Sequence, residues 1–170
     1  KYFLMVGRLI AYKRHDIAIE AFNKLGLPLK IIGRGPELER LQKLAGPNIE
    51  FLGRVPDELL PAYYQHCEAF VFPQEEDFGI VAIEALAAGS PLIAYHGGDI
   101  PEHVTEGQQG IFFYEQTPEA IQKAVEGFRS ETFDRQKIAA SALRFDKEQF
   151  RATIKSRIET LYEQHRQAEM

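Results

Sequence analysis

Two glutamates flank a predicted strand-to-helix turn in the middle of the chain. The apolar run at residues 69–72 predicts a buried strand, and Pro73 ends it because proline cannot donate a ladder hydrogen bond. An acidic loop follows, and the spacing predicts a helix that opens at about Gly79, with Glu76 before it and Glu84 within it. A helix N-terminus attracts anions, and carboxylates accept hydrogen bonds from hydroxyl groups. Together they suit an anion that carries hydroxyls, such as a nucleotide sugar.

The backbone and the depth of this turn give two further expectations. Gly79 has no Cβ, which predicts that a ligand approaches the helix opening closely. The helical spacing of Ile80, Ile83, Leu86 and Ala87 predicts the inner face of the helix. Glu84 falls close to that face, where a carboxylate normally has a partner or a function. The alternative is a solvated acidic loop with an exposed Glu84.

Two cations follow the first predicted strand, residues 2–6. Gly7 lets the backbone turn, and Arg8 and Lys13 come after it. An arginine offers a planar fork to phosphate oxygens, and a lysine offers a point charge, so the pair predicts a diphosphate site. Arg8 directly ends a buried strand and is the stronger candidate. For Lys13 taken alone, we favour the interpretation as a solvated surface charge.

A third loop, Gly-Gly-Asp-Ile-Pro-Glu at residues 97–102, is ordinary turn chemistry and predicts little alone. His96 and His103 lie beside it without the clustered spacing of a metal site, and we interpret both as surface or structural residues. No metal is therefore expected. The chain also lacks the phosphate loop, the dinucleotide fingerprint and the nucleophile elbow, which disfavours NTPases, nicotinamide enzymes and α/β-hydrolases.

The elements that must position these residues alternate between strand and helix. Short apolar runs predict strands at residues 2–6, 29–32, 49–52, 69–72, 92–95 and 111–114. Helices are predicted between them, with Asp16 as the N-cap of the first and with Pro36 and Pro56 opening the next two. The pattern predicts an α/β, Rossmann-like three-layer fold with a six-stranded parallel sheet. Such sheets bind ligands at the carboxyl ends of their strands, where the loops described above would meet.

The composition is that of one ordinary globular domain. The chain has 170 residues, 45% hydrophobic and 26% charged, and a net charge of −5 that argues against non-specific nucleic-acid binding. Cys67 is the only cysteine, which excludes an intrachain disulfide and fits a reducing compartment. No apolar run has the length of a membrane span, so a cytoplasmic location is expected. The chain starts in a strand without Met, which suggests a piece of a larger protein, and residues from about 133 to 170 form a helical tail.

Taken together, these motifs resemble the C-terminal half of GT-B-fold glycosyltransferases of family four. Glu76 and Glu84 match the Glu-x₇-Glu signature of that family. The further matches are Val-Gly-Arg-Leu at residues 6–9 with Lys13, Ile-Gly-Arg-Gly-Pro at 32–36, Phe-Leu-Gly-Arg-Val at 51–55, and Pro-Leu-Ile-Ala at 91–94. Order and spacing agree from about residue 2 to residue 114. Arg34 departs from the pattern, because relatives often have an acidic or small residue there.

The resemblance implies a role for each matched residue. Arg8, Lys13 and Glu76 would form the catalytic set: the two cations bind the donor diphosphate, and Glu76 accepts hydroxyls of the transferred hexose. Glu84 would accept those of the ribose. Arg54 and Val55 would lie beside the base, and Gly33 would line the pocket. The N–H groups of Phe78, Gly79 and Ile80 would face the sugar and the distal phosphate, and Gly7 would complete the donor-binding set.

The resemblance also implies the activity and its partners. The chain would be a single donor-binding domain, residues 1–170, of a retaining hexosyltransferase that uses a nucleotide-diphosphate sugar without a metal or other cofactor. The sequence at residues 78–81 and 93–95 looks most like that of family members that use GDP-mannose, which implies a mannosyltransferase. The N-terminal acceptor domain is absent, so binding without useful catalysis is expected, and any peripheral membrane contact would come through that domain. A non-catalytic nucleotide-binding regulatory module and a sugar-nucleotide epimerase of similar fold remain the alternatives.

Overall fold

The computed structural model describes residues 1–168 and contains a six-stranded sheet of order β3-β2-β1-β4-β5-β6. All neighbouring strands are parallel. The strands are β1 (Phe3–Val6), β2 (Leu29–Ile32), β3 (Ile49–Gly53), β4 (Phe70–Phe72), β5 (Leu92–Tyr95) and β6 (Gly110–Phe113). The sheet order reverses between β1 and β4, because the chain moves outward through β2 and β3 and then returns to the other side of β1. The predicted α/β architecture is confirmed.

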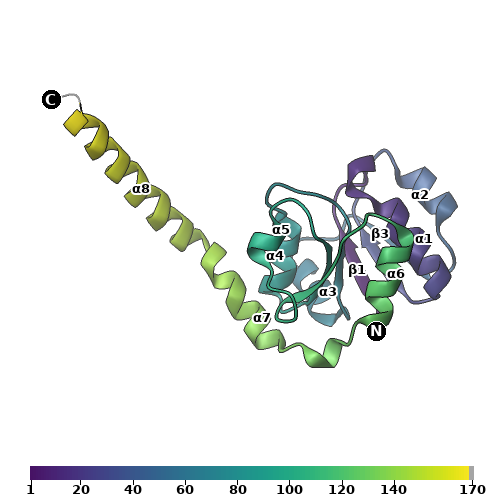
Figure 1. The fold of residues 1–170 in the computed structure, drawn as a ribbon. Helices are drawn as coiled ribbons and strands as arrows, with labels where there is room; N and C mark the ends of the chain where they lie inside the picture. The colour runs from purple at the N-terminus through teal and green to yellow at the C-terminus, as the bar shows by residue number, and fades with distance from the viewer. Residues whose placement is uncertain (169–170) are drawn as a thin grey trace.

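Helices cover both faces of the sheet (Figure 1). One core contains side chains of α1 (His15–Leu25), α2 (Leu38–Leu44) and α6 (Pro118–Gly127). The other contains side chains of α3 (Leu60–His66), α4 (Ile80–Ala87), α5 (Ile100–His103) and α7 (Arg135–Ser141). The short 3-10 turns are η1 (Ala11–Lys13), η2 (Ser130–Thr132) and η3 (Ala142–Phe145). Two separate cores on the two faces of one sheet make the three layers that the sequence predicts.

Three helix starts differ from the prediction. Asp16 is not the N-cap of α1: the helix begins at His15, and Arg14, in the left-handed region with φ of 52°, is its N-cap. Asp16 instead lies in the first turn, where its carboxylate accepts from Arg14 Nε at 3.3 Å and faces the positive end of the helix. Pro36 and Pro56 precede the helices they were predicted to open, since α2 begins at Leu38 and α3 at Leu60.

The buried face of α4 agrees only in part with the prediction: Ile83 and Leu86 are buried as predicted, whereas Ile80 and Ala87 are not. Its buried side chains are Ala82, Ile83, Ala85 and Leu86. Ile80 is 65% exposed, and Glu84 and Ala87 are exposed as well, so the stripe at i, i+4 and i+7 points outward. An almost uniformly apolar helix has no clear polar face, so periodicity could not tell which stripe packs on the sheet.

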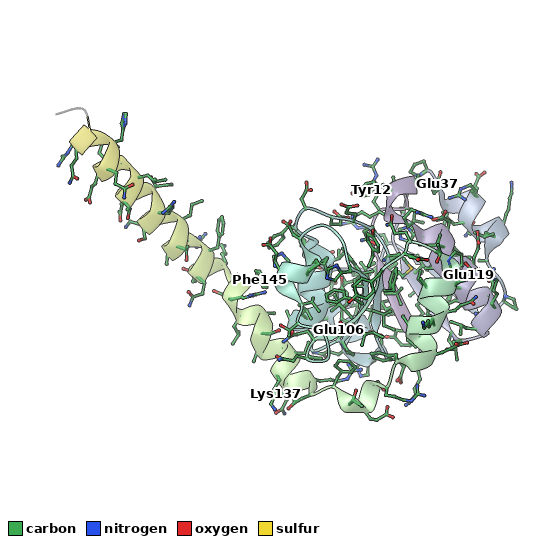
Figure 2. All side chains as sticks on the ribbon, viewed as in Figure 1. Tyr12, Glu37, Glu106, Glu119, Lys137 and Phe145 are labelled. Atoms are coloured by element: carbon green, nitrogen blue, oxygen red, sulfur yellow. The ribbon has the colours of Figure 1, made fainter. Side chains whose placement is uncertain are left out.

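The last helix, α8 (Lys147–Ala168), extends away from the rest of the molecule (Figure 1). Its side chains point into solvent all around the helix (Figure 2). Five large apolar residues on it are exposed: Phe150, Ile154, Ile158, Leu161 and Tyr162. Helix α7, in contrast, packs on α4 through buried Ile138. The predicted tail therefore divides into a docked part and an extended part.

Candidate functional site

The loops that follow β1 and β2 are in direct backbone contact at the carboxyl edge of the sheet. Leu9 N–H donates to the carbonyl of Arg34 at 3.0 Å. A Cβ on Gly33 would collide with the carbonyl oxygen of Gly7, and one on Gly35 would collide with that of Leu9. The predicted glycines thus let two loops approach each other, which fixes where the side chains after β1 emerge.

Lys13 and Glu76 form an ion pair between η1 and the loop after β4. Their side chains are only 14% and 18% exposed, and burial lowers the pKa of Lys13. Lys13 is therefore not a solvated surface charge. The structure brings together one predicted cation and one predicted carboxylate from loops that are far apart in the sequence.

Arg8 emerges directly after β1 and is exposed. Within residues 1–168 its guanidinium forms no ion pair, so its charge is available to a ligand at this edge. Arg54 is also exposed and Val55 is half-buried, both after β3. The loops after β2 and β3 are joined by the Gly33 N–H, which donates to the carbonyl of Gly53 at 2.8 Å.

The opening of α4 lies next to Glu76, but Gly79 acts differently from the prediction. Gly79 is the N-cap, with φ of 76°, and no side chain caps the helix. A Cβ at this position would lie 2.9 Å from Ile100 Cδ1 and 3.1 Å from Phe72 Cζ, inside the core. The left-handed backbone and core packing therefore already require a glycine here, and the close approach of a ligand stays a prediction. The N–H groups at Phe78, Gly79 and Ile80 still belong to an uncapped helix N-terminus, which favours an anion.

Glu84 occupies the exposed stripe of α4, not a position near the buried face, yet it does have a partner. The hydroxyl of Tyr64, on α3, donates to Glu84 Oε2 at 3.0 Å. Glu84 borders a hollow of about 530 Å³ between α3 and α4. Glu76 borders a separate hollow of about 400 Å³ together with Tyr12, Arg14 and Gln116. Glu84 also borders a hollow of about 700 Å³ between α4 and the tail, so the two carboxylates of the signature border different hollows.

The loop at residues 97–102 supports Glu76, a role that the sequence did not predict. Asp99 N–H donates to the carbonyl of Glu76 at 3.0 Å. Gly98 has φ of 59°, and a Cβ on it would collide with the same carbonyl oxygen. The signal was present in Gly97-Gly98-Asp99, but local turn chemistry cannot reveal which segment the turn packs against.

The burial of His15 was not predicted from the sequence, which indicated a loop at this position. It is 4% exposed, and its Nδ1 has no hydrogen-bond partner within residues 1–168. Burial, with a smaller contribution from the charge of Lys13, lowers its pKa to about 4, against an opposing effect of Asp16. His15 is therefore neutral at neutral pH, and it lies close enough to Lys13 to feel its charge.

Three aromatic rings connect the helix opening to the tail. Phe78 packs edge-on against His103 at 5.0 Å and against Phe145 at 5.7 Å between ring centroids. Phe145 lies in η3, where the chain turns toward α8 (Figure 2). Arg144 Nη2 also donates to the carbonyls of Glu102 and His103. His103 is thus structural, as predicted, and the tail reaches the edge of the site.

Two features are absent from residues 1–168, the part of the chain that the structure describes. No group of three or more His, Cys, Asp or Glu side chains there could hold a metal ion. No helix in the same range is both long and apolar enough to cross a membrane.

The family model described as "Glycosyl transferases group 1" matches residues 1–144. The chain belongs to this family. This group 1 chain is 33% identical over 138 residues to a GDP-mannose-dependent α-(1-6)-phosphatidylinositol monomannoside mannosyltransferase of Mycolicibacterium smegmatis, covering 71% of the chain and 36% of the relative. It is 32% identical over 150 residues to the sulfoquinovosyl transferase of Arabidopsis thaliana, covering 85% of the chain and 29% of the relative. It therefore spans about a third of the length of the curated relatives it matches.

Solved structures of glycosyltransferases have the same fold. Anabaena HepE in complex with UDP-glucose matches with a TM-score of 0.75 and 22% identity, covering 92% of this group 1 chain and 49% of HepE. Sucrose-phosphate synthase of Thermosynechococcus elongatus matches with a TM-score of 0.75 and 24% identity, covering 99% of this chain and 46% of that enzyme. The chain resembles the C-terminal domain of GT-B glycosyltransferases, as the motifs predict.

Proposed function

We propose that this chain is the donor-binding domain of a glycosyltransferase that transfers a hexose from a nucleotide-diphosphate sugar. The observation that carries the proposal is the ion pair of Lys13 and Glu76 beside the uncapped opening of α4. A site for phosphate alone needs the cation and the helix N-terminus. Such a site does not need a poorly exposed carboxylate beside the cation. A site that also binds a sugar needs one, because the carboxylate accepts hydrogen bonds from sugar hydroxyls. Membership in the group 1 family supports the same choice.

In this proposal the donor changes the partner of Lys13. A diphosphate that reaches the α4 opening competes with Glu76 for the ammonium group, because it carries the larger negative charge. Glu76 is then free to accept hydrogen bonds from the hexose. The backbone of Glu76 stays in place because the Asp99 N–H donates to its carbonyl.

The chemistry of transfer follows from the same groups. Cleavage of the anomeric bond builds negative charge on the departing diphosphate. Arg8, Lys13 and the N–H groups of α4 would stabilise that charge more strongly than the ground state, which lowers the barrier. Retention of configuration and independence from a metal remain predictions. Comparing turnover of an active, longer form with and without EDTA would test metal independence.

The identity of the donor is the finer part of the proposal. We favour GDP-mannose, and the mycobacterial relatives named GDP-mannose-dependent mannosyltransferases support this lean. Other relatives are named sulfoquinovosyl and D-rhamnosyl transferases, and HepE was solved with UDP-glucose. A donor panel must therefore include GDP-, UDP- and ADP-sugars. The protein's cytoplasmic location also stays a prediction.

Calorimetry with this chain tests the proposal. The wild type should bind one nucleotide sugar selectively, and Glu76→Ala should weaken that ligand while it leaves the matching nucleoside diphosphate unchanged. Glu126→Ala, on α6 over the other face, is the matched control because its side chain is exposed and far from the α4 opening. Equal weakening of both ligands by Glu76→Ala would contradict the hexose role. If no nucleotide or nucleotide sugar binds the wild type, the chain is not a donor domain.

A further inference from the structure

Tyr64 is a buried side chain whose only polar atom is directed at the exposed carboxylate of Glu84. The residue is 2% exposed, and its ring packs edge-on against Phe70 with centroids 5.5 Å apart. Its hydroxyl donates to Glu84 Oε2 at 3.0 Å. Burial, reinforced by the charge of Glu84, raises the pKa of Tyr64 well above its usual value. The hydroxyl therefore keeps its proton and remains a donor.

The backbone carbonyl of Tyr64 is also held by hydrogen bonds from buried side chains. Its carbonyl oxygen accepts from Ser90 Oγ, which is fully buried just before β5. The same oxygen accepts from Cys67 Sγ at 3.1 Å. The tyrosine hydroxyl consequently has a position set by the core of the molecule and not by solvent.

The side chain of Glu84 lies at the surface, and without the hydrogen bond from Tyr64 it would be mobile. It lies on the outward stripe of α4, at the rim of the hollow between α3 and α4. One oxygen, Oε2, is held by Tyr64, and no protein donor within residues 1–168 reaches the other. A long, flexible side chain loses rotamer freedom when it binds a ligand, and ordering it beforehand removes that cost.

We propose that Tyr64 is a positioning residue, which holds Glu84 so that its free oxygen accepts a hydrogen bond from a ribose hydroxyl of the donor. The inference rests on the proposed function, because it requires a nucleotide in the site. It extends that function in one respect: discrimination between ribose and deoxyribose depends on a tyrosine that does not itself touch the ligand.

The competing explanation is that the Tyr64–Glu84 hydrogen bond only ties α3 to α4. Tyr64→Phe separates the two explanations, since it removes the hydroxyl and keeps the ring against Phe70. Tyr63→Phe is the matched control: the same change, on the neighbouring residue, in a side chain that forms no hydrogen bond with Glu84 within residues 1–168. A fold-only role would lower stability and weaken every ligand alike.

The experiment is calorimetry on this chain with GDP, UDP and ADP and with the 2′-deoxy and 3′-deoxy forms of each. We expect the wild type to favour the ribonucleotide over at least one deoxy form by about tenfold, the size of one hydrogen bond to a charged group. Tyr64→Phe should reduce that preference to about twofold or threefold without changing the affinity for the deoxy form. Tyr63→Phe should keep the full preference.

A second measurement tests whether Tyr64 acts through Glu84. In a Glu84→Ala background, Tyr64→Phe should have no further effect on the preference for ribose. If Tyr64→Phe weakens ribo- and deoxynucleotides equally, or still acts without Glu84, the positioning role is wrong. A wild type that binds nucleotides without any ribose preference would overturn the inference and leave the donor-domain proposal standing. A wild type that binds no nucleotide overturns both.

Discussion

The ammonium group of Lys13 contacts the carboxylate of Glu76, and neither side chain is more than a fifth exposed. One residue follows the first strand of the sheet and the other follows the fourth, yet β1 and β4 are neighbours in space. The pair therefore closes the carboxyl edge of the sheet where its order reverses. Open α/β sheets bind their ligands at such a reversal.

This contact predicts strong coupling between the two residues. Lys13→Met should leave the Glu76 carboxylate poorly hydrated and unpaired, and Glu76→Gln should do the same to the ammonium group. We expect a coupling free energy of about 1–3 kcal/mol in a double-mutant cycle, measured by urea unfolding. Additive effects of the two substitutions would show that the pair contributes no interaction energy.

Gly98 should tolerate a side chain far less well than Gly107, which also has a left-handed backbone. Gly107→Ala has the same left-handed backbone cost but open space around the new methyl group, so it should cost about 1–2 kcal/mol. Gly98→Ala adds a collision with the Glu76 carbonyl and should cost clearly more. Thermal unfolding compares the two variants. Equal losses would mean that the loop yields without disturbing Glu76.

His15 should make stability depend on pH. Its pKa of about 4 in the folded chain lies below the ordinary value of 6.5, so between these values the unfolded chain binds more protons. Stability should thus be full above pH 6.5 and fall as the pH decreases toward 4, by at most about 3 kcal/mol from this residue. Urea unfolding across this range should show a shallower loss for His15→Leu. His66→Leu, at an exposed position, should keep the wild-type slope.

The extended helix should add little to the stability of this chain. Ile158 is 60% exposed, so Ile158→Lys should change the free energy of unfolding by less than about 0.5 kcal/mol. Ile138, on the docked helix α7, is fully buried, and Ile138→Ala should cost about 2–5 kcal/mol. A large loss from Ile158→Lys would mean that α8 packs on the chain in solution.

Arg8 should matter more for turnover than for donor binding. It is exposed and forms no ion pair within residues 1–168, so its charge is free to act on the departing diphosphate. In an active, longer form that contains this chain, Arg8→Ala should lower the turnover number by about 10²–10³ and raise the donor KM much less. Arg151→Ala, on α8, is the control. Wild-type turnover in Arg8→Ala would contradict the role.

The motifs predicted the sheet and the loops at its carboxyl edge, because short apolar runs and the turns between them are local features. They also predicted that the chain resembles group 1 glycosyltransferases, since Glu76, Glu84 and their spacing are read directly from the sequence. The predicted depth of Glu84 was wrong, because its side chain is exposed and does not lie near the buried face of α4. This error arose in α4, whose nearly uniform apolar composition hides which side faces the core.

The sequence by itself determined which residues are available for chemistry and the order of the elements that carry them. Only the tertiary structure decided the partners: Lys13 with Glu76, the loop at Gly98 beneath Glu76, and Tyr64 with Glu84. The physical reason is the crossover of the chain, which places strands distant in sequence side by side. Contacts of that kind leave no local sequence pattern, because each residue is equally compatible with the strand, helix or turn of its own segment whether or not the contact forms.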